Sequence, residues 1–277
     1  MSGKNGNHGR GGMRVLLFHA VVRERPRRAS WRERKYWMGI DEFRAHVSLL
    51  AEGGYSVLPL DRAWQTRPSR VGNSPTLWPG QLPAPVVLTL DDGHASAGEV
   101  VWPMLREAGM AATFFVNTAT LGTHGHLRWR DVRAMGASGA SFASHGHRHA
   151  DMTALGCRAL DVELRMSKDL LEGWTGQRVE FFAAPYGRVN RRVVDAALAA
   201  GYRAVCTSVP MPARRGSAKV SRIAIHTGTS PEELCGFLDG RRFPYWARRA
   251  RAACLAWPKR LLPVPQARPA AEPEAAR

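Results

Sequence analysis

Short apolar segments alternate with helical patterns along most of this chain, and this alternation constrains the fold more than any other feature. The most apolar segment, Val86–Asp91, has the continuous apolar character of a strand that is buried on both faces of a parallel sheet. A strand followed by a helix, repeated about seven times, predicts an α/β fold. So many units favour a closed or nearly closed (β/α) barrel, in which chemistry lies at the C-terminal ends of the strands.

The expected elements follow from the apolar periods, the helix-start residues and the Gly/Pro breaks. The predicted strands are Met13–His19, Tyr55–Leu58, Val86–Asp91, Ala112–Val116, Ala140–Ser144, Val179–Ala183, Arg203–Thr207 and Val220–Ile225. The predicted helices are Ile40–Ala51, Ser96–Ala108, Trp129–Met135, Leu155–Trp174, Arg191–Ala200 and Pro231–Leu238.

The net charge of +17 is concentrated at the two ends of the chain. Residues 1–35 hold ten basic and two acidic side chains, residues 241–277 hold nine and two, and the stretch between them is nearly neutral. A nucleic-acid-binding protein would place a basic stripe on its folded body, so we expect no nucleic-acid partner. Basic tails are instead consistent with binding to anionic lipids or with a role in keeping the protein soluble.

The basic C-terminal segment has an amphipathic pattern. On a helical wheel, Trp246 and Trp257 share one side with small residues, and Arg248, Arg249 and Arg251 fall opposite. This arrangement suits the headgroup region of an anionic membrane, so residues 243–262 are a candidate membrane-binding segment. The alternative is that the two tryptophans pack on the folded body.

The location of the protein is predicted from its apolar runs and cysteines. Val15–Val22 is too short to span a bilayer and lacks a following cleavage site, so neither a signal peptide nor a transmembrane helix is expected. The four cysteines form no Cys-x-x-Cys pair, which is typical of reduced, buried thiols. We therefore expect a cytoplasmic protein, with peripheral attachment to the inner face of the membrane if residues 243–262 bind lipid.

Two groups of chemically active residues directly follow predicted strands. In Thr89–Gly93 the adjacent carboxylates of Asp91 and Asp92 repel each other unless a cation or proton lies between them, although Asp-Gly is also an ordinary turn dipeptide. In the second group, His145 and His149 would face the same way on a helical turn and could share a metal ion. Two imidazoles with a carboxylate form the three-ligand open site of metal hydrolases.

The third group, Phe182–Gly187, also follows a predicted strand. Pro185 and Gly187 bracket a turn that can aim the backbone N–H between them. With these three motifs the chain resembles the polysaccharide deacetylases, carbohydrate esterase family four. Thr89–Gly93 matches the first family motif, His145-x-x-x-His149 the second, and Phe182–Gly187 a variant of the third with Ala184 in place of Tyr.

The resemblance covers roughly residues 13–238 and implies a distorted, TIM-like (β/α) barrel of about seven strands. It implies hydrolysis of an N-acetyl group from an amino sugar by a divalent metal, zinc first, with cobalt, nickel or iron as alternatives. Such a metal polarises the carbonyl and lowers the pKa of bound water towards about 7. By family position, Asp92, His145 and His149 would hold the metal, Asp91 would be the general base, and the Tyr186 N–H would stabilise the oxyanion.

Two departures from the family pattern stand out. The arginine that steadies the catalytic aspartate in the third motif is replaced here by Ala183 or Ala184, so this support must come from elsewhere. Ile223–His226 loosely resembles the family's Leu-x-His, which makes His226 a candidate acid for the leaving amine. His19 and His94 also follow predicted strands, as substrate contacts or structural residues.

The expected organisation is a disordered N-terminus over residues 1–12, a catalytic domain over 13–240, a basic amphipathic segment over 241–265 and a disordered tail over 266–277. The expected substrate is a GlcNAc-type glycan or a cytoplasmic precursor, such as a lipid-linked sugar. Two alternatives remain open: hydrolysis of another C–N bond, as in a cyclic ureide or imide, and a non-catalytic basic protein that binds membrane or nucleic acid.

Overall fold

The computed structural model describes residues 12–24, 30–66 and 85–239. Its centre is an eight-stranded, all-parallel sheet in the order β10-β1-β4-β5-β6-β7-β8-β9, curled into a half-barrel. The predicted α/β barrel fold is therefore confirmed, with eight strands in place of about seven. The strands are β1 (Arg14–Phe18), β4 (Val86–Leu90), β5 (Ala112–Val116), β6 (Ser141–Ser144), β7 (Phe181–Ala183), β8 (Ala204–Cys206), β9 (Lys219–Val220) and β10 (Ile223–Ala224).

The last two strands show how far the sheet curls. β9 pairs with β8 at one edge and β10 pairs with β1 at the other, yet only Ser221 and Arg222 separate them in the chain. The prediction of one strand over Val220–Ile225 was wrong for this reason, because the chain crosses the open seam of the half-barrel between its two short pairings.

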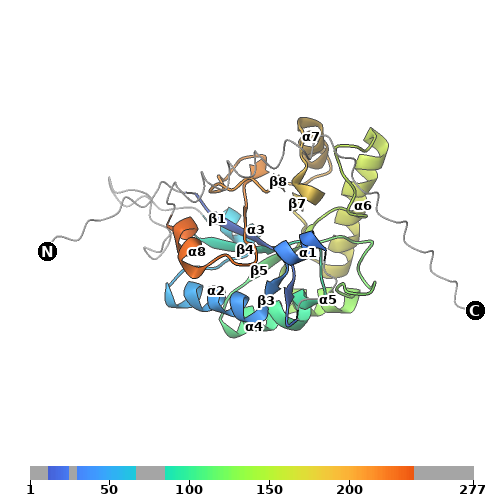
Figure 1. Ribbon diagram of the computed structural model, residues 1–277. Coiled ribbons are helices and arrows are strands. Elements are labelled where there is room, and N and C mark those ends of the chain that lie inside the picture. Colours follow the sequence, from blue (N-terminus) through green and yellow to red (C-terminus); the bar gives the residue numbers. More distant parts are fainter. Residues whose placement is uncertain (1–11, 25–29, 67–84, 240–277) are drawn as a thin grey trace, which may run out of the picture.

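Helices pack around the outside of the curled sheet, from α2 and α4 through α5 to the long α6 and then α7 (Figure 1). Their bounds are α2 (Ile40–Glu52), α4 (Trp102–Glu107), α5 (Trp129–Ala137), α6 (Cys157–Thr175), α7 (Arg191–Ala199) and α8 (Pro231–Leu238). The predicted helix Ser96–Ala108 begins as a wider π-helical turn, Ala97–Val101. Pro103 follows this turn and has no N–H to donate to the preceding turn.

The apolar core has two layers because strand side chains alternate between the faces of the sheet. Leu88, Phe114 and Phe182 point outward and pack under the helices. Val87 and Phe115 belong to a second cluster on the inner face, where smaller side chains such as Ala183 fill the curled interior. Since both faces are covered, the strands read as continuous apolar runs.

The segments before β4 differ most from expectation. The predicted strand Tyr55–Leu58 forms only a single bridge, Val57 to Val86, before Pro59 ends the pairing for lack of an N–H. Four short elements lie where the sequence pattern predicted none: β2 (Val21–Val22), α1 (Trp31–Tyr36), β3 (Met38–Gly39) and α3 (Leu60–Gln65).

The prediction of buried thiols is partly wrong, because Cys206 is buried whereas Cys157 is exposed at the start of α6. Across residues 12–24, 30–66 and 85–239, no helix is both long and apolar enough to cross a membrane. The candidate membrane segment 243–262, the predicted disordered tail 266–277 and residues 1–11 of the predicted disordered N-terminus 1–12 lie outside the described residues.

Candidate active site

The predicted site residues converge at one end of the barrel. Asp91 and Asp92 follow β4, His145 and His149 follow β6, and Tyr186 lies in the turn Pro185–Gly187 after β7. Because all eight strands are parallel, their C-terminal ends meet at the same rim. This topology brings together side chains that are up to about a hundred positions apart in sequence.

Three of these residues form a compact set of possible metal ligands. Atoms of Asp92, His145 and His149 all lie within 4.8 Å of one another. The Asp92 Oδ1 is 3.3 Å from the Nε2 of each histidine. The Nδ1 of His145 hydrogen-bonds the Ala183 carbonyl at 2.7 Å, which orients the ring and leaves Nε2 toward the cluster. Histidine ligands of metals are held in this way, so the residues present fit a divalent ion.

The sequence predicted that the two histidines lie on a helical turn. In the structure they lie on a loop that follows β6. Gly146 (φ 81°) and His149 (φ 58°) have left-handed backbone conformations, and these bring the rings to a centroid distance of 5.0 Å. The buried carboxylate of Glu163, on α6, accepts hydrogen bonds from the N–H groups of His147 and Arg148 at 2.8 and 2.9 Å. Glu163 therefore fixes the loop; its only signal in the sequence is its place on the inward face of α6.

Backbone strain is concentrated at this rim. Among the described residues, the non-glycine residues with positive φ are Asp92 (74°), His149 (58°) and Tyr186 (61°). Each such residue costs about 1–3 kcal/mol and persists only where its surroundings enforce it. All three are predicted site residues, which indicates that the fold holds this geometry against local preference.

Asp91 has a different partner from its neighbour. Its two carboxylate oxygens accept hydrogen bonds from the two terminal nitrogens of Arg222 at 2.7 and 2.8 Å, and both side chains are almost completely buried. Burial by itself would raise the pKa of Asp91, but the charges of Arg222 and His145 outweigh it, so this pKa lies below its usual value. Asp91 is thus a buried anion beside the ligand cluster. Arg222 provides the support that the third motif lacks, from the two-residue link between β9 and β10.

Two further histidines lie on the other side of Asp91. The N–H of Asp91 donates to the carbonyl of Phe18, so His19, which directly follows the neighbouring strand β1, is level with Asp91. His226 follows β10, one strand further away. Burial lowers the pKa of His19, and the carboxylates of Asp92 and Asp91 only partly oppose this shift. The strand register therefore makes His19 a neighbour of Asp91, whereas the predicted His226 lies beyond it along the rim.

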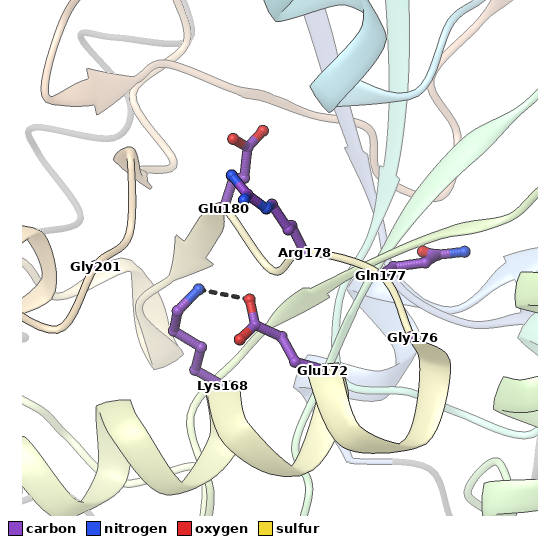
Figure 2. A pocket seen from close by; sticks show the side chains of 7 residues that line it. All are labelled: Lys168, Glu172, Gly176, Gln177, Arg178, Glu180 and Gly201. Carbon is purple, nitrogen blue, oxygen red and sulfur yellow. Dashed lines mark hydrogen bonds and ion pairs between the residues drawn. The ribbon is translucent and has the colours of Figure 1, made fainter.

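A hollow between the end of α6 and the start of β7 is not part of this site (Figure 2). Within it, Lys168 donates to Glu172 at 2.8 Å and to the Val179 carbonyl, and the Val179 N–H donates back to Glu172. The hollow lies at the N-terminal end of β7, opposite the histidines, and these polar groups satisfy one another. They join α6 to the sheet.

Carboxylates and histidines at the C-terminal rim of a parallel half-barrel are typical of (β/α)-barrel enzymes. The family model for polysaccharide deacetylase matches residues 81–205, which include all three motifs. Residues 81–205 of this chain therefore resemble the polysaccharide deacetylase family. The resemblance stated from the sequence is confirmed.

Known relatives agree with this assignment. The Bacillus subtilis protein YxkH, named as a polysaccharide deacetylase, is 27% identical over 205 residues, which cover 73% of this chain and 70% of the relative. A chitooligosaccharide deacetylase of Rhizobium leguminosarum bv. trifolii is 30% identical over 127 residues, or 45% of this chain and 56% of the relative.

Solved structures share the fold. The Streptococcus pyogenes deacetylase PplD, solved in complex with acetate, superimposes with a TM-score of 0.72 at 24% identity and covers 83% of this chain and 99% of its own. IcaB from Ammonifex degensii superimposes with a TM-score of 0.66 at 22% identity, covering 83% and 98%. At these identities the similarity shows a shared fold alone, namely the barrel with its curled sheet.

Proposed function

We propose that this protein is a metal-dependent deacetylase that removes N-acetyl groups from a GlcNAc-type glycan or glycan precursor. One observation carries the proposal: Asp92, His145 and His149 form a three-ligand cluster, and next to it Asp91 is held as an anion by Arg222. Two neighbouring carboxylates in unlike surroundings can take unlike roles. One would hold a metal and the other would accept a proton.

In this proposal a divalent ion, zinc first, would polarise the acetamide carbonyl and make a water molecule more acidic. Asp91 would take the proton of the attacking water, and Arg222 would keep Asp91 ionised and oriented. The Tyr186 N–H would donate to the oxygen of the tetrahedral intermediate. His226 would return a proton to the leaving amine. The alternative is His19, which follows the strand next to β4 and is level with Asp91.

Acetate release from a panel of N-acetylated glycans, with added zinc and with a chelator, tests the function. Release that depends on the metal supports the proposal. Release of ammonia or a carboxylate from a cyclic ureide or imide, without acetate from any glycan, would favour the alternative C–N hydrolase. A cytoplasmic site of action, a lipid-linked substrate and membrane contact through residues 243–262 stay predictions.

Removal of one proposed ligand should remove the metal. We expect purified wild-type protein to bind about one divalent ion and the His149→Ala variant to bind far less, because one of three protein ligands is lost. Elemental analysis after dialysis measures this. His124→Ala is the matched control, since His124 is exposed on a loop outside the cluster. Equal metal content in all three proteins would refute the assignment.

The general acid can be separated from other roles by the choice of leaving group. If His226 protonates the amine, His226→Ala should slow amide hydrolysis by about 10²–10⁴-fold. Hydrolysis of an activated ester should change little, because its leaving group needs no proton. His19→Ala is tested in parallel, since His19 follows the strand next to β4 and is level with Asp91. Should only His19→Ala show this selective loss, the acid is His19; equal slowing of both substrates would indicate a role in folding or binding.

A further inference from the structure

A short segment before α2 forms part of the rim beside the proposed site. We call residues 30–39, which include α1 and β3, the rim segment. It is held to the barrel at several points: the Thr227 N–H and Oγ1 donate to the carbonyls of Lys35 and Trp37 at 3.1 and 2.7 Å, and the Met38 N–H donates to the Ala20 carbonyl at 2.9 Å. Its backbone is therefore tied to the loops after β1 and β10.

This segment places two aromatic side chains against the histidines of the rim. The Tyr36 ring lies between those of His19 and His226, with centroid distances of 4.5 and 5.0 Å. The Trp37 ring lies 5.1 Å from that of His94, which follows the Asp91-Asp92-Gly93 turn. The five aromatic side chains are all half-buried: His19, Tyr36, Trp37, His94 and His226. Their rings therefore lie along the border of the site and are not part of the core.

The contacts also make this aromatic edge rigid. Nδ1 of His94 lies 2.9 Å from Ser96 Oγ, and the same hydroxyl accepts the Val21 N–H at 3.1 Å. Val21 belongs to β2, which pairs with β3 in the rim segment. Trp37 and His94 are thus fixed to each other through both ring contact and backbone. A preorganised surface of this kind loses little conformational entropy when a ligand binds.

We propose that Tyr36 and Trp37 form a subsite for a second sugar ring, next to the sugar that is deacetylated. Aromatic rings offer a flat apolar face with a polar edge, which matches the C–H face and the hydroxyl edge of a pyranose. The position of Tyr36 against His19, level with Asp91, makes this surface continuous with the proposed site. The substrate would then contain at least two sugar rings, because the subsite holds the ring next to the one that is deacetylated. This inference rests on the proposed function.

The test compares N-acetylglucosamine with its β-1,4-linked tetramer, using wild type, Trp37→Ala, Trp37→Phe and Tyr36→Ala. We expect Trp37→Ala and Tyr36→Ala to lose about 10–100-fold in kcat/KM for the tetramer. Only Trp37→Ala should keep the wild-type rate on the monomer, because the Tyr36 ring contacts His19 and His226, the two candidate acids. Trp37→Phe should retain most of the tetramer activity, because it keeps an aromatic face. Trp174→Ala is the matched control, since Trp174 is exposed and stacks on Trp129 instead. In Trp37→Ala, equal loss on both substrates, or no loss on the tetramer, overturns the subsite.

A binding measurement keeps this result separate from the proposed activity. Calorimetric titration of the four proteins with the tetramer, in the presence of a chelator, reports the subsite without catalysis. Weaker binding in the two alanine variants supports the subsite even if no acetate is ever released, in which case only the deacetylase proposal fails. If wild-type protein neither binds nor hydrolyses the tetramer, the subsite is wrong. Acetate release with unchanged binding in every variant overturns the subsite alone.

Discussion

Asp91→Asn should lower kcat for acetate release by about 10²–10⁴-fold, the range expected when a general base is removed. The amide has nearly the same shape as the carboxylate but cannot accept the proton of the attacking water. Because Asp92, His145 and His149 are unchanged, the metal content should equal that of the wild type. Steady-state kinetics together with elemental analysis measure both quantities.

The control for this substitution is Asp161→Asn, which makes the same chemical change at an exposed position on α6. It should leave kcat unchanged. If Asp91→Asn turns over at the wild-type rate, another residue is the base. If its metal content falls with kcat, Asp91 is a ligand and the two carboxylates do not have separate roles.

The second large effect concerns the stability of the fold. Arg222→Leu would leave the Asp91 carboxylate buried without its cation, and breaking a buried ion pair in this way costs about 3–5 kcal/mol. We expect the free energy of unfolding to fall by about that amount and deacetylation to be lost. Chemical denaturation, followed by fluorescence, measures the midpoint.

A double variant separates the charge from the shape of Arg222. Adding Asp91→Asn to Arg222→Leu removes the unpaired charge, so much of the lost stability should return while activity stays absent. Arg203→Leu is the control, because its ion pair with Glu180 is partly exposed and should be worth less than about 1 kcal/mol. A stable Arg222→Leu protein, or a double variant no more stable than the single one, would contradict the role given to Arg222.

Much of the site could be predicted from local sequence because of the parallel topology. An apolar run identifies a buried strand, and the residue after the run then lies at the catalytic rim whatever the order of the strands in the sheet. This reasoning was enough to place Asp91, Asp92, His145, His149 and Tyr186 near one another. It needs no knowledge of register or of loop conformation.

The remaining features depend on contacts between distant parts of the chain. Arg222 reaches Asp91 across 131 positions because β9 and β10 pair with opposite edges of the sheet. The polar pair Ser221-Arg222 interrupts the run Val220–Ile225, but the sequence does not reveal that the two halves pair with opposite edges of the sheet. The loop that carries His149 is held by Glu163 on α6, which accepts the N–H of the preceding residue, Arg148. The aromatic edge formed by Tyr36 and Trp37 is held in place by contacts with Thr227, near the end of the described chain, and with Ala20 after β1. Local periodicity records which face of an element is buried, whereas these features depend on which other element lies against that face.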